Sequence, residues 1–367
     1  MKITKYILIS FLAISLASCG NEANVNSSNK DSNVAVEDEA QNQDVSETTD
    51  GQAESNDEQA SESESEDSSG QDSDTITITD KHGEVTVPKN PKRVVALDSR
   101  TFEVLEKFGV DLVAAPKDVM PADSSYVADE KVQNIGNHKE PNLEILAAAD
   151  PDLVILGQRF AKYYDDIKAL LPNASIIDID MDVSEETESP GNNLLEGYIN
   201  STKILGEIFN KNDEAEKLID DLEESLDKAK NAYNGESVMG VIVSGGEIGY
   251  SAPKYGRVWG PIFELLDLKP ALEVENDSSD HMGDDISVEA IAQSNPAYLL
   301  VLDRDAAVSS EADAKPARDV IENSEALKDL DVIKNEKIYY APNDTYTNES
   351  IITFTEILNG LAETFKN

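Results

Sequence analysis

The chain has 367 residues and a formal net charge of −44, because 74 aspartates and glutamates stand against 30 lysines and arginines. Such acidity argues against a broad electrostatic affinity for nucleic acid or for anionic lipid surfaces. A single cysteine excludes an intrachain disulfide and a thiolate metal cluster, and three histidines are too few for a histidine-rich zinc site.

The N-terminus has the pattern of a secretory signal. Lys2 and Lys5 precede an apolar stretch at 6–16 that is too short for a comfortable membrane span. Small residues then lead into Cys19, an order that resembles a bacterial lipobox. The resemblance implies a signal peptide at 1–18, lipidation of Cys19 and anchoring at the outer face of the cell membrane. The expected cell type is Gram-positive. An ordinary signal peptide with an incidental cysteine is the alternative.

An acidic tether is predicted to follow. Residues 20–74 hold 17 acidic residues, one basic residue and no aromatic residue, leucine or isoleucine. Such a segment buries too little apolar surface to offset the entropy of ordering it, and its like charges extend it. We therefore expect 19–74 to form a solvated spacer after the lipidated cysteine. Binding of cations by the acidic run is the alternative.

The rest of the chain has the alternating pattern of an α/β fold. Apolar residues alternate with polar ones in 75–79 and 84–87, around a turn that contains Asp80 and Gly83, and this predicts a hairpin. Short apolar runs separated by helix-like segments then predict βα units whose strands are buried on both faces. The runs form two series, the first at 94–97, 112–115, 153–156 and 176–179 and the second at 238–243, 298–302 and 338–340.

A helical tract separates the two series. Apolar residues recur at helical spacing in its second half, from Ala215 to Tyr233. The predicted fold class is therefore α/β, with two α/β lobes joined by a single long backbone helix and a ligand cleft between the lobes. The predicted boundaries are an N-terminal lobe at 75–190, a bridging helical tract at 191–233 and a C-terminal lobe with a final helix at 234–367.

The two lobes repeat the same spacing. Glu144 and Glu289 each precede a proline by seven residues and an arginine, Arg159 or Arg304, by fifteen. In each copy a capping residue stands before the glutamate, whose carboxylate suits a helix N-terminus, and the proline opens a buried strand. Ligands of open α/β sheets bind beyond the carboxyl ends of the strands, so we expect both arginines to face one cleft between the lobes.

From residue 75 onward the sequence resembles the substrate-binding lipoproteins of iron–siderophore ABC transporters, of the catecholate or petrobactin type. The resemblance rests on the order of several segments, at 75–87, 88–95, 151–159, 255–260 and 302–304. It implies the class III periplasmic-binding-protein fold. It also implies a monomer without a cofactor or enzymatic activity, which binds a ferric siderophore and delivers it to a cognate permease and its ATPase.

The resemblance also assigns roles to single residues. It implies three arginines in the cleft, which map onto Arg159, Arg257 and Arg304. A histidine and a tyrosine that approach or ligate the iron map onto His281 and Tyr346. Surface ion pairs of the arginines, an exposed loop histidine and ordinary loop packing of the tyrosine are the alternatives.

The chemistry of such a ligand agrees with these assignments. Ferric iron held by three catecholates carries a formal charge of −3 on an aromatic shell, which guanidinium groups can bind through forked donors. Tyr255 and Trp259 lie beside Arg257 in the sequence, where they could pack on the ligand's rings; for Trp259 a place in the core is the equal alternative. Arg100 is not expected in its loop and is either a fourth cation of the pocket or a solvent-facing side chain.

The matched glutamates have a second role by resemblance. In the family, paired glutamates meet arginines of the permease, one from each lobe, and Glu144 and Glu289 fit that pattern. Stabilisation of the helix N-termini alone is the alternative.

Two other functions remain open at this stage. A haem- or cobalamin-binding receptor of the same transporter class could use Tyr346 or His281 as an axial ligand, although the arginines favour a trianionic complex. A cell-surface hydrolase is the less favoured alternative. Ser244 and the two glycines after it resemble a nucleophile turn, but no histidine is placed to act as its base.

Overall fold

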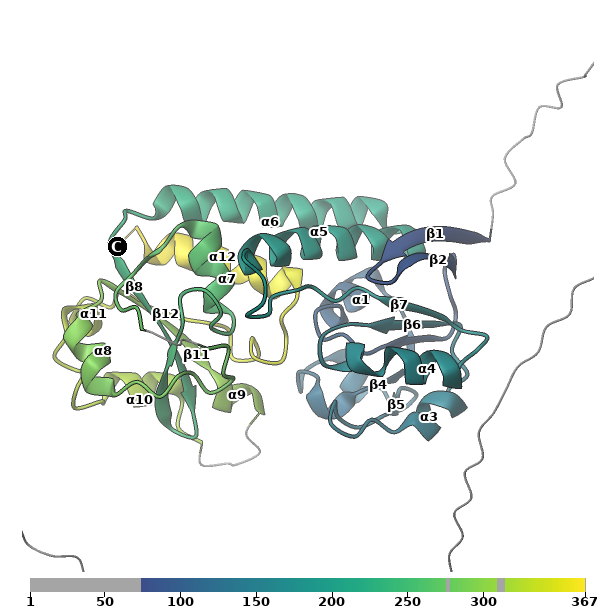
Figure 1. Cartoon of the computed structure of the whole chain (residues 1–367), viewed down its shortest axis with the longest axis horizontal. Coiled ribbons are helices and arrows are strands. Elements are labelled where there is room, and N and C mark those ends of the chain that lie inside the picture. The colour runs from purple at the N-terminus through teal and green to yellow at the C-terminus, as the bar shows by residue number, and fades with distance from the viewer. Residues whose placement is uncertain (1–73, 275–277, 309–313, 367) are drawn as a thin grey trace, which may run out of the picture. The chain divides into compact units, whose positions relative to one another are not determined.

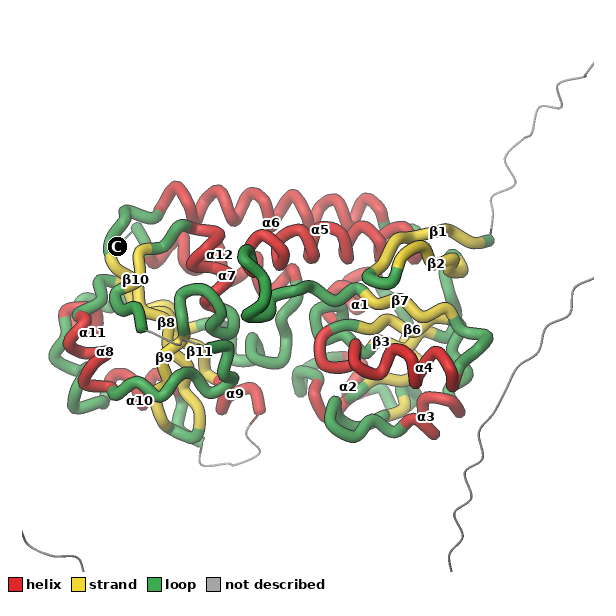
Figure 2. Tube along the Cα trace, viewed as in Figure 1, coloured by secondary structure: helices red, strands yellow, loops and turns green. Residues whose placement is uncertain are grey.

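Figures 1 and 2 show the computed structural model, which describes residues 74–274, 278–308 and 314–366. These residues belong to one compact unit. The predicted signal peptide, the lipidation site Cys19 and almost all of the predicted tether lie outside the described residues. Within the part that the structure describes, no helix combines the length and apolarity needed to cross a membrane.

The N-terminal lobe is built on the first predicted series of strands. Its five-stranded sheet has the order β5-β4-β3-β6-β7 and is parallel throughout. Every residue of β6 is buried, as expected for a strand covered on both faces. The predicted hairpin is also present, and β2 packs beside β7. The strands are β1 (Thr75–Asp80), β2 (Gly83–Pro88), β3 (Val94–Ala96), β4 (Leu112–Ala115), β5 (Gln133–Asn134), β6 (Leu153–Leu156) and β7 (Ser175–Asp178).

The C-terminal lobe holds the second series. Its sheet has the order β10-β8-β11-β12, all parallel, and β9 pairs antiparallel with β8. The central strand β11 is fully buried, like its counterpart β6. The strands are β8 (Ser237–Ser244), β9 (Glu247–Ser251), β10 (Lys269–Pro270), β11 (Tyr298–Asp303) and β12 (Ile338–Tyr340).

Short helices connect the strands in both lobes (Figure 1). They are α1 (Phe102–Phe108), α2 (Ser125–Ala128), α3 (Leu143–Ala148), α4 (Tyr164–Leu170), α7 (Trp259–Leu266), α8 (Val288–Ser294), α9 (Arg304–Val308), α10 (Ala317–Glu322), α11 (Asp331–Lys334) and the 3₁₀ helices η1 (Lys117–Val119) and η2 (Gln158–Tyr163). The predicted final helix is α12 (Ile351–Thr364), which packs on both α1 and α6.

The bridging tract consists of two helices, α5 (Pro190–Phe209) and α6 (Asn212–Ala232), where the sequence had indicated one. The break occurs at Asn210, which has a left-handed φ of 54° and donates its backbone N–H to the Gly206 carbonyl. Gly206 also lets the second helix return closely, because a Cβ there would lie 2.7 Å from that of Ala215. The two helices therefore form a hairpin, side by side in Figure 1.

This hairpin connects the lobes. α5 starts against the C-terminal lobe, where Glu264 of α7 accepts from the Gly191 backbone N–H at 2.8 Å. It ends at the N-terminal lobe, where the Ile208 carbonyl accepts from the Asn90 backbone N–H at 2.8 Å. α6 then returns the chain, and the ring of Tyr233 after its last turn lies 5.2 Å from that of Phe365. The predicted connection by a long helix is thus confirmed by α6, a helix of 21 residues.

Candidate ligand-binding site

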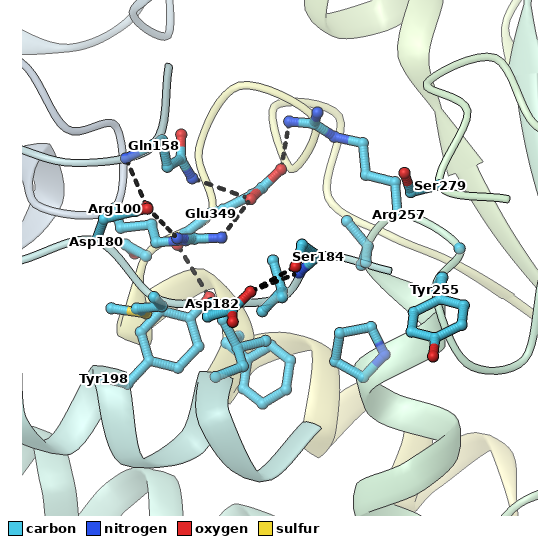
Figure 3. A pocket seen from close by; sticks show the side chains of 18 of the residues that line it. Arg100, Gln158, Asp180, Asp182, Ser184, Tyr198, Tyr255, Arg257, Ser279 and Glu349 are labelled. Carbon is cyan, nitrogen blue, oxygen red and sulfur yellow. Dashed lines mark hydrogen bonds and ion pairs between the residues drawn. The ribbon is translucent and has the colours of Figure 1, made fainter. Parts of the chain in front are cut away.

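A cavity of about 640 Å³ lies between residues of the two lobes, a volume typical of small-molecule sites. Its polar wall includes equal numbers of basic and acidic side chains. Figure 3 shows several of them, among them Arg100, Arg257 and Glu349. The basic residues are Lys81, Arg100, Arg159 and Arg257, and the acidic ones are Asp180, Asp182, Glu186 and Glu349.

The repeated spacing places its two arginines in equivalent positions. Arg159 lies in η2 directly after β6, and Arg304 is the first residue of α9 directly after β11. The predicted caps are confirmed. The side chain of Asn142 accepts from the Ile145 backbone N–H at 2.9 Å, and that of Ser287 from the Ala290 backbone N–H at 3.2 Å. Local capping and strand ends therefore put an arginine at the carboxyl edge of each sheet.

The predicted arginine triad gathers around one aromatic ring. The guanidinium carbon of Arg257 lies 4.1 Å from the ring centroid of Tyr346, and that of Arg304 lies 5.2 Å from it. Burial and the nearby charge of Arg257 lower the pKa of Arg159, while Tyr346 and Glu349 offset part of this effect. Arg159 and Arg257 line the cavity, whereas Arg304 does not and instead donates to the Ser244 hydroxyl at 3.2 Å.

Arg100 belongs to the pocket. The residue is 6% exposed and lines the cavity, with Asp98 behind it. Burial lowers the pKa of Arg100, but the carboxylates around it, Glu349 and Asp98 foremost, raise it above the ordinary value. Burial raises the pKa of Asp98 to about 7, against the attraction of Arg100. A Cβ on Gly157 would lie 2.2 Å from Oδ2 of Asp98, so the glycine makes room for this buried carboxyl.

Glu349 connects the arginines of the two lobes (Figure 3). Its Oε1 pairs with Nη2 of Arg257, and its Oε2 lies 3.6 Å from Nη2 of Arg100. The same Oε2 accepts from Nε2 of Gln158 at 3.1 Å. The backbone is held as well, because the Tyr198 hydroxyl donates to the Glu349 carbonyl at 3.0 Å. This carboxylate is therefore the centre of the polar network in the cavity.

A strained turn aims Arg257 into the site. Its carbonyl accepts from the Trp259 backbone N–H at 2.7 Å across Val258, whose φ is 65° and ψ is −54°. This is the rare γ-turn of positive φ, and a β-branched residue makes it costlier. Strain of this kind gathers at ligand-binding and catalytic sites, where the surrounding structure maintains it.

Of the two alternatives for Trp259, the structure supports the core and not the pocket. The residue is fully buried, its indole N–H donates to the Val241 carbonyl at 3.2 Å, and it does not line the cavity. Gly240 explains its position, because a Cβ on this residue of β8 would lie 3.2 Å from Trp259 and the bare backbone admits the ring. Tyr255, by contrast, lines the cavity and donates to the Thr187 carbonyl at 3.2 Å.

The predicted iron-approaching pair is not brought together at the cavity. The side chain of His281 is 55% exposed, has Asp280 at 3.9 Å and is not among the residues that line the cavity. Tyr346 is buried beneath the arginines and lines a smaller adjoining pocket. A different histidine, His138, lines that smaller pocket together with Arg159. Burial and the charge of Arg159 lower the pKa of His138.

Sequence reasoning missed Gln158, Asp180 and Glu349. The first two follow the carboxyl ends of β6 and β7, so the strand-end rule that found Arg159 could also have found them. Nothing in the local sequence marks Glu349, which stands in the loop before α12 and meets Arg100 only in the folded chain.

A family model described as "Periplasmic binding protein" matches residues 94–345. The chain belongs to this family. The segment after Ser244 is a hairpin turn: Gly245 and Gly246 join two antiparallel strands, and the serine hydroxyl accepts from Arg304. A nucleophile turn would lead from a strand into a helix.

Curated relatives within the family are binding proteins. The petrobactin-binding protein YclQ of Bacillus subtilis is 29% identical over 73% of this chain and 79% of its own length. The ferric-anguibactin-binding protein FatB of Vibrio anguillarum is 27% identical over 80% of this chain and 88% of its own. The chain also shares the fold of the periplasmic catecholate-siderophore binding protein VctP of Vibrio cholerae, at 24% identity. Its TM-score is 0.65, over 80% of this chain and 99% of that one.

Proposed function

We propose that this chain is the extracytoplasmic substrate-binding protein of an ABC transporter and that it binds a ferric siderophore of the catecholate or mixed catecholate type. Its family and the names of its relatives support the class of ligand. One observation supports the site in particular: Arg159 and Arg257, which come from opposite lobes, line the same cavity.

The chemistry of the cavity suits an anionic iron chelate. Guanidinium groups stay ionised when partly buried and offer paired donors to catecholate oxygens. A charge-assisted hydrogen bond contributes about 1.5–3 kcal/mol, so a few of them provide much of the roughly −12 kcal/mol that nanomolar affinity requires. The rings of Tyr255 and Tyr198, labelled in Figure 3, add aromatic surface near the cations.

Absorbance tests this proposal directly. The soluble chain without residues 1–19 is incubated with a ferric tris-catecholate, with haemin or with cobalamin and separated from free ligand by gel filtration. We expect only the ferric catecholate to co-elute with the protein, at one ligand per chain. Co-elution of haemin or cobalamin without the ferric complex would contradict the proposal.

Attachment to the membrane and to the permease extends the same proposal. We infer that Cys19 carries the lipid anchor at the outer face of the membrane and that the receptor acts as a monomer. The exposed glutamates Glu144 and Glu289, each in the first turn of its helix, are the proposed contacts with arginines of the permease. Metabolic labelling with palmitate should mark the full-length chain and not a Cys19→Ala variant.

A further inference from the structure

The guanidinium groups of Arg100 and Arg257 have an anionic partner within the protein itself. Glu349 contacts Arg257 with one carboxylate oxygen and approaches Arg100 and Gln158 with the other. Its side chain is 16% exposed, and the arginines are 20% and 5% exposed. These are therefore largely desolvated contacts, which bulk water and salt weaken less than ion pairs at the surface.

We propose that Glu349 is a resident counter-ion that an anionic ligand must displace from the arginines. This inference rests on the proposed function, since the displaced contacts are those that the ferric complex would make. It goes beyond that function by assigning a selective role to a carboxylate inside a site for anions.

Both chemistry and packing favour displacement of Glu349 over direct binding of the ligand by its carboxylate. A carboxylate has no donor for catecholate oxygens and repels a negative complex. The position of Glu349 is also well supported, because the Tyr198 hydroxyl binds its carbonyl and the next residue, Ser350, caps α12 with contacts to Ile352 and Thr353. The backbone therefore stays in place while the side chain can rotate away from the arginines.

Displacement makes the cavity select large anions over small ones, because only a large anion makes more contacts with the arginines than Glu349 does. A small anion such as phosphate replaces the carboxylate at one guanidinium and gains little, because it forfeits the contacts that Glu349 makes with two arginines. A large chelate reaches Arg159 as well as Arg100 and Arg257, so it gains contacts that Glu349 does not make. The resident carboxylate thereby lowers the affinity for every anion and excludes small ones.

The test compares Glu349→Gln with a matched variant, Asp182→Asn. Both substitutions are isosteric and remove one negative charge from the cavity wall, but the Asp182 carboxylate is held by the hydroxyl and backbone N–H of Ser184 and not by an arginine. Titrations use a ferric tris-catecholate of charge −3, a neutral ferric hydroxamate, and inorganic phosphate as a competitor. Thermal unfolding confirms that each variant is folded.

We expect Glu349→Gln to bind the ferric tris-catecholate about tenfold more tightly than wild type, because the variant removes a negative charge that repels the trianion in a partly desolvated site. Asp182→Asn should give a smaller gain, and the neutral complex should change less than about twofold in either variant. Phosphate should compete at lower concentration in Glu349→Gln. An unchanged or weakened affinity for the trianion in this variant, or a gain no larger than that of Asp182→Asn, would overturn the inference.

Failure of the proposed function looks different. If neither wild type nor Glu349→Gln binds the ferric catecholate, the proposed ligand is wrong. The counter-ion role is then judged by phosphate alone, which should raise the unfolding temperature of Glu349→Gln and not that of wild type. Equal responses of the two proteins to phosphate would refute the counter-ion role.

Discussion

Replacement of Arg159 by alanine should weaken ligand binding without lowering the stability of the fold. Arg159 is half-buried beside another cation, and burial together with the charge of Arg257 lowers its pKa. A cation whose pKa is lower in the folded state than in the unfolded state destabilises the fold near neutral pH. The loss of this side chain should therefore leave the unfolding temperature unchanged or raise it slightly. With an anion bound, wild type should instead unfold at a higher temperature than Arg159→Ala, because the anion offsets the repulsion between the two arginines.

The loss of affinity follows from one charge-assisted contact. Arg159→Ala should weaken binding of the ferric tris-catecholate by about 1.5–3 kcal/mol, or roughly ten- to a hundredfold. Fluorescence or absorbance titration measures the loss, and a neutral ferric hydroxamate serves as the second ligand. The control is Arg318→Ala, which removes an arginine that is 63% exposed on α10 and paired with Glu322. The reasoning is refuted if a folded Arg159→Ala protein binds the trianion as wild type does, or if Arg318→Ala loses as much.

Three further outcomes are expected. Arg304→Ala should weaken the ferric complex by less than Arg159→Ala, because Arg304 does not line the cavity and lies against Tyr346, which lines only the smaller adjoining pocket; equal losses would contradict this order. Since burial raises the pKa of Asp98 to about 7 from 3.8, the folded protein retains a proton that the unfolded chain releases. The contribution of Asp98 to stability should therefore fall as pH rises from about 4 to about 7. Across that range the free energy of unfolding, measured with denaturant, should fall less or rise more with pH in Asp98→Asn than in wild type, and an identical pH dependence of the two proteins would refute this assignment. The double variant Glu144→Ala and Glu289→Ala should bind the siderophore normally but not support iron uptake, so normal uptake in cells would argue against the docking role.

The fold was largely predictable because its signals are local. Each buried strand is a short apolar run, and the caps at Asn142 and Ser287 precede the helices that they begin. The break in the helical tract was not predictable in the same way. Asn210 ends α5 with neither proline nor glycine beside it, and the hairpin closes because Gly206 and Ala215 can touch, which is a contact between two helices.

The site was predictable only where it depends on strand ends. Arg159 follows a buried strand directly, so its place at the cavity follows from topology. The pocket alternative for Trp259 used proximity in sequence to Arg257, and it failed because the intervening γ-turn sends the arginine towards the cavity while the ring turns onto Gly240. His281 was assigned by resemblance alone, and its exposed loop position gives that role no support from packing.

The pairing of carboxylates with the arginines of the cavity was the part of the site least predictable from the sequence. An acidic chain that binds an anion must gather cations, and cations gathered in a partly desolvated cavity repel one another. The pKa of Arg159 is lowered by burial first and by the charge of Arg257 second. Carboxylates that interleave with the arginines relieve this repulsion. Asp180 and Glu349 do so here, although they lie far apart in the sequence. The affinity for an anion is then set by the difference between the contacts it makes and those it replaces, so a count of arginines overestimates it. For this reason the carboxylates of the cavity, rather than further cations, are the positions at which substitution should strengthen binding.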